Sequence, residues 1–219
     1  MKYIIILFLG LIFGLSCIHN NIQFNDFILL EGDLLFQDLD KDSIDNAIEK
    51  VTQTQSGYNF THVGIVLIEN KKPVVLEAIS KGVVLTPIDT FMKRNLNTDG
   101  KPKVVAARLK SKYTSYIPEA IEEGKKLLGK AYDHVYIIGD DNYYCSELIY
   151  EMFNQTYPEQ NIFKLNPMTF KDPETNKFLP FWKTYYDSLR VAIPEGEPGL
   201  NPNGMSMDTV LDLVWDFGK

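Results

Sequence analysis

The sequence lacks a long basic run and a long apolar run. Its 22 lysine and arginine residues are outnumbered by 29 aspartate and glutamate residues, which gives a formal net charge of −7. An acidic chain of this kind gains no electrostatic attraction to phosphate, so we expect no nucleic-acid partner. The apolar stretch at residues 4–15 is roughly 12 residues long, well short of the ~20 that a permanent membrane-spanning helix needs.

The first residues have the order of a signal peptide. Lys2 precedes the apolar stretch, and the small residue Ser16 stands directly before Cys17. Cys17 resembles the cysteine that receives a lipid in bacterial lipoproteins, although Gly14 stands where such motifs usually have leucine. We predict a signal peptide at residues 1–17, a lipid on Cys17 and a tether at residues 18–26, with plain secretion as the alternative. The protein is then exported to the cell envelope, at the periplasm or the cell surface, and anchored to a bacterial membrane.

Cysteine and histidine are also scarce, with 2 and 3 copies in the chain. A lipid on Cys17 leaves Cys145 as the single thiol of the mature protein, which excludes an intrachain disulfide. The remaining cysteine and histidines are too few for the usual four-ligand zinc site, and we expect no metal and no cofactor. An unpaired cysteine is either a small buried apolar side chain or a reactive group.

What the chain does have is a pattern of short strands and helices. Its 219 residues, 45% of them hydrophobic, can bury one sizeable core, so we place a single domain at residues 27–219. Residues 90–101 are expected to be a polar excursion, and the chain after Tyr157 is expected to form wrapping loops with one further strand. The pattern predicts strands at residues 34–36, 61–68, 74–79, 82–85, 103–109 and 189–193, and helices at residues 42–51, 116–128 and 146–153. This is an α+β domain with an antiparallel sheet or partial barrel packed against helices.

The clearest hairpin joins residues 61–68 to residues 74–79. If its turn centres on Asn70 and Lys71, His62 and Glu77 emerge on the same face of the sheet, one diagonal step apart, within reach of a hydrogen bond. A register slip of one residue would place them on opposite faces. Glu77 is expensive to bury in an apolar strand without a partner, which favours a functional role.

Cys145 stands at the predicted start of the helix at residues 146–153, whose Glu147 and Glu151 are expected on the exposed side. The partial positive charge and free N–H groups of a helix N-terminus stabilise a thiolate and can form part of an oxyanion hole. A thiolate nucleophile also needs an imidazole partner. His62 lies in a strand, where core filling alone explains it poorly.

The two other histidines are weaker partners. His19 lies in the expected tether, and His134 is either a packing residue or a substrate contact. Taken one at a time, a cysteine, a strand histidine and a strand glutamate are structural more often than catalytic.

Their joint arrangement resembles the permuted, NlpC-type papain-like cysteine hydrolases of the YiiX/YaeF group. The resemblance covers residues 30–205 and rests on residues 31–36, 61–66, 77–78, 132–133, 143–150 and 193–199. It implies a circularly permuted papain-like fold with Cys145 as nucleophile, His62 as general base and acid, and Glu77 orienting the imidazole. It also implies that Tyr132 reaches the nucleophile and the oxyanion. Tyr144 stands where many unpermuted relatives have aspartate, so their substrate contacts do not carry over directly.

We therefore expect a cysteine hydrolase that opens an amide through a thioester on Cys145, with Tyr132, Tyr144 and His134 as oxyanion or substrate contacts. The substrate is a cell-wall peptide or another amide of the envelope, and the oligomeric state stays open. One alternative is a lipid acyltransferase or acyl hydrolase that uses the same residues. Another is a non-catalytic lipoprotein that binds envelope ligands. The aromatic residues Phe163, Phe178, Phe181, Trp182, Tyr185 and Tyr186 line a lipid groove in the first alternative and are core and loop packing otherwise.

Overall fold

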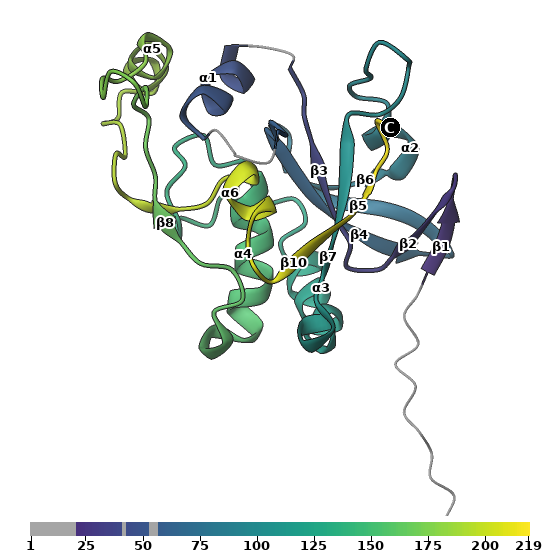
Figure 1. Cartoon of the computed structure of the whole chain (residues 1–219). Coiled ribbons are helices and arrows are strands. Elements are labelled where there is room, and N and C mark those ends of the chain that lie inside the picture. The colour runs from purple at the N-terminus through teal and green to yellow at the C-terminus, as the bar shows by residue number, and fades with distance from the viewer. Residues whose placement is uncertain (1–20, 41–42, 53–56) are drawn as a thin grey trace, which may run out of the picture.

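A six-stranded antiparallel sheet forms the centre of the molecule (Figure 1). The computed structural model describes residues 21–40, 43–52 and 57–219, so the expected signal peptide and Cys17 lie outside the described residues. The strand order is β10-β7-β3-β4-β5-β6, every pair antiparallel. The strands are β3 (Leu34–Gln37), β4 (His62–Glu69), β5 (Lys72–Ile79), β6 (Gly82–Pro87), β7 (Val104–Leu109) and β10 (Leu211–Asp216). The expected α+β architecture is thereby confirmed.

The turn between β4 and β5 fixes the register of the predicted hairpin. Asn70 and Lys71 both have left-handed backbones, with φ of 51° and 62°. Two consecutive left-handed residues match the twist of a two-residue hairpin. The resulting pairs run from Glu69 opposite Lys72 to Ile65 opposite Leu76. The expected turn centre is confirmed.

Two apolar layers cover the two faces of the sheet. On one face α3 (Ile117–Lys126) and α4 (Cys145–Thr156) pack against each other and α4 packs on the sheet, burying Ile65 and Leu76 of the hairpin. On the other face α2 (Ile88–Met92) lies against the hairpin, with Val66 and Val75 in contact with its side chains. The alternation of a strand sends Ile65 to one layer and Val66 to the other.

The remaining elements lie around the sheet. Helices α1 (Ser43–Val51) and α5 (Pro180–Leu189) contact each other in a third, aromatic cluster that includes Tyr136, Trp182 and Tyr186. The short elements are β1 (Asn21–Phe24), β2 (Phe27–Leu30), the 3₁₀ turns Ser111–Tyr116 and Pro158–Gln160, β8 (Asn166–Pro167), β9 (Pro198–Gly199) and α6 (Pro202–Ser206). Strand β1 pairs with β2, so residues 21–24 of the expected tether form part of a hairpin. Among the described residues, no helix combines the length and the apolar character needed to cross a membrane.

The carboxyl-terminal third differs most from the expectation. The strand predicted at residues 189–193 is wrong, because Leu189 ends α5 and Arg190 takes a left-handed backbone at φ 59° that closes the helix. Val191 N–H then donates to Tyr186 O, which completes the helix end instead of a strand ladder. Strand β10, which pairs with β7 at the edge of the sheet, was not expected.

A glycine in β4 leaves the room that the site requires. A Cβ built on Gly64 lies 2.4 Å from Val75 Cγ1 and 3.2 Å from the Cβ of Glu77. Val75 is buried and β-branched, so it cannot rotate away easily.

We therefore expect Gly64→Ala to destabilise the fold by about 1–3 kcal/mol, through overpacking of the β4–β5 pair. The matched control is Gly204→Ala, where no neighbour lies closer than 3.4 Å to the new Cβ. Urea denaturation measures both. Equal unfolding free energies for the two variants would contradict a steric role for Gly64.

Candidate active site

Cys145 is the first residue of α4, as the sequence predicted. Tyr144 before it has an extended backbone at φ −88° and ψ 170°, which ends the preceding loop and lets the helix begin at the cysteine. Cys145 is an unpaired, buried cysteine whose side chain lines a cavity. Its sulfur therefore lies beside the free N–H groups of a helix N-terminus.

Glu147 holds the loop that precedes Cys145 in place through hydrogen bonds. Its carboxylate accepts hydrogen bonds from the backbone N–H groups of Tyr144 at 3.3 Å and Gly139 at 3.2 Å. The exposed position expected for Glu147 is wrong, because the loop folds over this side of α4 and buries it completely. Burial raises the pKa of Glu147 to about 8, against the opposing effect of these two backbone bonds.

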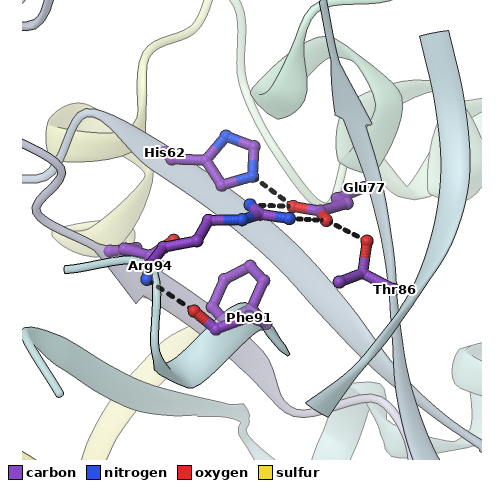
Figure 2. Close-up of polar contacts among 6 residues, drawn as sticks. His62, Glu77, Thr86, Phe91 and Arg94 are labelled. Atoms are coloured by element: carbon purple, nitrogen blue, oxygen red, sulfur yellow. Dashed lines mark hydrogen bonds and ion pairs between the residues drawn. The ribbon is translucent and has the colours of Figure 1, made fainter. Parts of the chain in front are cut away.

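His62, the first residue of β4, is hydrogen-bonded to Glu77 of β5 on the same face of the sheet. Its Nε2 lies 2.6 Å from Glu77 Oε2 (Figure 2), and both side chains are buried. The hydrogen bond expected from the hairpin register is therefore present. Because Nε2 faces Glu77, Nδ1 is the ring nitrogen left for the hydrogen bond between His62 and Cys145.

Two residues that the sequence did not single out complete the surroundings of Glu77. Arg94 donates to both carboxylate oxygens, with Nη1 2.6 Å from Oε2, and the Thr86 hydroxyl donates to Oε1 (Figure 2). Arg94 follows α2 and lies over the ring of Phe91, 5.1 Å from its centroid. The residues expected as a polar excursion thus supply a charged partner of the site. The sequence did contain a signal for such a partner, because a glutamate buried in a strand needs a cation beside it.

The electrostatics of this group favour a charged carboxylate and a charged imidazole. Burial alone would raise the pKa of Glu77, but its hydrogen bonds to His62 and Arg94 outweigh burial and lower the pKa to about 2. Burial alone would lower the pKa of His62, but its hydrogen bonds to Cys145 and Glu77 raise the pKa to about 9. Glu77 is anionic and His62 cationic across the neutral range.

The loop before α4 places Tyr132 beside the cysteine. Burial and the charge of Cys145 raise the pKa of Tyr132 well above its usual value, so its phenol stays protonated and can donate a hydrogen bond. Asp133 holds this loop by accepting from the N–H groups of Val135 at 2.6 Å and Ile137 at 2.8 Å.

The other expected contacts lie around Tyr132. The exposed ring of His134 meets it edge-on at 5.0 Å between centroids. The buried Tyr144 hydroxyl accepts a bond from Leu200 N–H at 3.2 Å, and its side chain lines the same cavity as Cys145.

Two cavities meet at the cysteine and the histidine. One, of about 910 Å³ with its opening included, is lined by Cys145 and the other, of about 1430 Å³, by His62. Four residues line both: Ile48, Thr61, Tyr132 and Tyr136. Three of the aromatic residues considered for a lipid groove line these cavities: Trp182 lines the first, and Phe181 and Tyr185 line the second. Phe163 and Tyr186, and also Trp182, are buried in the core.

One acidic cluster in the described part of the chain has the spacing of a cation site. Ligand oxygens of Asp38, Asp40 and Glu49 lie within 4.8 Å of one another. The ammonium of Lys103 contacts Asp38 and Asp40 and supplies positive charge there. Burial raises the pKa of Asp38 to about 6 and that of Glu49 to about 7, so the cluster holds fewer negative charges than three carboxylates suggest.

Comparisons with known proteins agree with the fold. Residues 29–215 match the family described as permuted papain-like amidase enzyme, YaeF/YiiX, C92 family. The uncharacterized protein YiiX of Escherichia coli strain K12 is 31% identical over 123 residues, and the chain spans 56% of the length of that relative. A crystal structure of yiiX from Escherichia coli O157:H7, described as a metalloprotein, has a TM-score of 0.68 at 24% identity over 85% of this chain and 96% of that one, which shows the fold.

Arg94 is expected to act on the reactivity of Cys145 as well as on stability. Arg94→Met removes one of the two cations that pair with the buried Glu77 carboxylate and should cost about 3 kcal/mol. Arg108→Met is the matched control, because Arg108 makes an equally two-pronged contact with the buried Asp33 at 2.7 and 2.8 Å. Both variants should lose stability to urea, but only Arg94→Met should slow alkylation of Cys145. Equal alkylation rates in both variants would remove Arg94 from the site.

The charge of His62 leads to a prediction about the pH dependence of stability. Its folded pKa of about 9 lies above the ~6.5 of an unfolded histidine. Its contribution to stability is therefore fully present below pH ~6.5 and is lost as the pH rises through about 9. NMR of the imidazole nitrogens should give a titration midpoint for His62 near pH 9. Glu77→Gln should lower this midpoint, because the variant loses the bond to the carboxylate that raises the pKa of His62. A midpoint near 6.5 in the unmodified protein would contradict the charged pair.

Proposed function

The chain belongs to the permuted papain-like amidase family, and from this membership we propose that it is a cysteine amidase that forms a thioester on Cys145. One observation carries the proposal: His62, hydrogen-bonded to Glu77, interacts with Cys145, which stands at a helix N-terminus in the wall of a cavity. The family supports a hydrolase of the amidase type. The roles of the individual residues are the proposal.

The first half of the reaction makes the thioester. The sulfur of Cys145, paired with the His62 imidazolium, attacks the carbonyl carbon of the amide. Negative charge then develops on the carbonyl oxygen, where the helix N-terminal N–H groups and the Tyr132 phenol donate hydrogen bonds. His62 gives its proton to the amine nitrogen as the C–N bond breaks.

The second half regenerates the enzyme. His62, neutral after losing its proton, takes a proton from a water molecule as that water attacks the thioester carbonyl. The C–S bond breaks, and the carboxylic acid leaves. Glu77 stays ionised throughout, because Arg94 and Thr86 satisfy its oxygens, and it keeps Nδ1 of His62 directed at Cys145.

The cellular setting is part of the same proposal. A signal peptide at residues 1–17 and a lipid on Cys17 would hold the enzyme at a bacterial envelope membrane. A cell-wall peptide or another envelope amide is then the substrate within reach. The support is the sequence of the first residues, which precede the described part of the chain.

Acyl transfer is a second candidate because of the cavity on the His62 side. This cavity of about 1430 Å³ can admit an amine or alcohol beside the imidazole, in place of water. His62 would then remove the proton of that acceptor. Mass analysis of the products separates the two outcomes, since hydrolysis yields a free acid and transfer yields a new amide or ester.

The proposal is tested by the pH dependence of Cys145 alkylation with iodoacetamide, with the labelled residue located by peptide mass. We expect rapid labelling well below pH 8, because a thiolate paired with imidazolium is the reactive form. His62→Ala should slow labelling at pH 6 by roughly tenfold or more, the effect of removing one adjacent opposite charge. Glu77→Ala should slow it less.

His134→Ala is the matched control, because His134 lines the same cavity as His62. It should leave the labelling profile unchanged. Labelling that follows an ordinary thiol in every variant would overturn the catalytic assignment and favour a protein that only binds envelope ligands.

A further inference from the structure

The hairpin of β1 and β2 and the neighbouring strand β10 leave apolar side chains exposed to water. Ile28 of β2 is 51% exposed and Trp215 of β10 is 39% exposed. Phe27, next to Ile28, stacks on the Trp215 ring with 5.4 Å between the ring centroids. Arg108 lies over the Phe27 ring and donates from Nη2 to the carbonyl oxygen of Ile28 at 3.1 Å. We call Phe27, Ile28 and Trp215 the hairpin patch, and these three residues lie outside the lining of both cavities.

The hairpin is fixed to the rest of the molecule. Leu29 is fully buried and packs in the apolar layer that contains α2. The Asp33 carboxylate accepts hydrogen bonds from Leu30 N–H at 2.9 Å and from Arg108 at 2.7 and 2.8 Å. The hairpin patch therefore keeps its place on the surface, and a partner that contacts it does not need to order it first.

The lipid proposed for Cys17 lies close to the hairpin patch along the chain. Strand β1 begins at Asn21, four residues after Cys17. Four residues span at most about 14 Å when fully extended. Asn21 pairs with Leu30, and Ile28 lies two residues away on the same strand, about 7 Å further. A lipid on Cys17 would thus lie within roughly 25 Å of the hairpin patch, once the step between the two strands is included.

A bilayer surface fits the side chains of the hairpin patch. Tryptophan is enriched at the membrane–water interface, and an exposed isoleucine gains free energy when it leaves water. A single lipid chain holds a protein at a membrane only marginally, so a second apolar contact strengthens the attachment. The formal net charge of −7 provides no attraction to anionic headgroups, so this contact depends on apolar surface.

Contact at the hairpin patch would also orient the candidate active site. In Figure 1 the hairpin of β1 and β2 lies at the right of the sheet, and α1 and α5 lie at the left. Residues of these two helices line the cavities, among them Ile48 of α1 and Tyr185 of α5. The sheet therefore stands between a bilayer at the hairpin patch and these two helices.

We propose that the hairpin patch rests on the membrane that holds the lipid of Cys17, with α1 and α5 on the side away from this membrane. The inference rests on the proposed function, in which Cys17 carries a lipid, and adds the orientation of the enzyme. This orientation favours a cell-wall peptide or a dissolved amide as substrate over a lipid of the same membrane.

The two tryptophans of the chain provide the measurement. Trp215 belongs to the hairpin patch, whereas Trp182 is 2% exposed in the core. The mature, lipid-bearing chain is placed in phosphatidylcholine vesicles in which part of the lipid carries a doxyl group, a quencher of tryptophan fluorescence, near the headgroup end of an acyl chain. Emission from Trp215 should fall by roughly twofold, as expected for a ring at the interface. Trp215→Phe keeps Trp182 alone, and its emission should stay unchanged.

A matched pair of charged variants tests the hairpin patch itself. Ile28→Glu places a carboxylate in the patch and should reduce the quenching of Trp215 by about half or more, because a charge resists entry into a bilayer. Val191→Glu is the control, since Val191 is 42% exposed and directly follows Arg190 at the end of α5. It should leave the quenching unchanged.

A relocated tryptophan tests the orientation. Leu189 is an exposed residue at the end of α5. Leu189→Trp in the Trp215→Phe background should give emission that the doxyl lipid does not quench.

Three results would overturn the orientation: unquenched Trp215 in a chain that floats with the vesicles, equal quenching in Ile28→Glu and Val191→Glu, or quenching in Leu189→Trp. Self-association in detergent that Ile28→Glu abolishes would assign the hairpin patch to a second copy of the chain instead. A chain that does not float with the vesicles lacks the lipid anchor, and the orientation fails with it. Alkylation of Cys145 in the same samples tests the catalytic proposal separately.

Discussion

The buried charge of Glu77 is the constraint on which the rest of the site depends. A carboxylate with no exposure to water must be matched by donors that cannot leave, and here they come from three elements: His62 of β4, Thr86 of β6 and Arg94 after α2. Satisfying one side chain therefore fixes two strands and a helix relative to β5. These contacts of Glu77 also set the orientation of the His62 imidazole. Gly64, which lacks a side chain, keeps the space beside Glu77 open.

The sequence predicted those parts of the site that local rules decide. The turn at Asn70 and Lys71 sets a register over a few residues, so the proximity of His62 and Glu77 followed from spacing alone. The start of α4 at Cys145 could also be predicted, because the preceding residues cannot continue a helix. Family resemblance supplied the permuted papain-like fold, which the family match from residue 29 to 215 confirms.

Contacts between distant segments could not be predicted in the same way. Arg94 lies in a stretch whose polar composition suggests a loop, and only the packing of α2 on the sheet brings it to Glu77. Glu147 has the helical position of an exposed residue, yet a loop from earlier in the chain covers it. The strand expected at residues 189–193 failed because Arg190 closes α5 in a conformation that side chains adopt rarely. A sequence pattern describes one segment at a time, whereas these outcomes depend on which other segments pack against it.

The row of Arg94, Glu77, His62 and Cys145 alternates in sign when the sulfur is a thiolate. Positive and negative charges then balance in pairs along a short line, and the field of such an arrangement decays with distance faster than that of a single charge. A site of this kind neither attracts nor repels an ionic substrate at long range, despite the formal charge of −7 on the whole chain. Its internal attractions also lie mostly out of reach of dissolved ions, so the reactive pair should depend on ionic strength far less than a surface ion pair does.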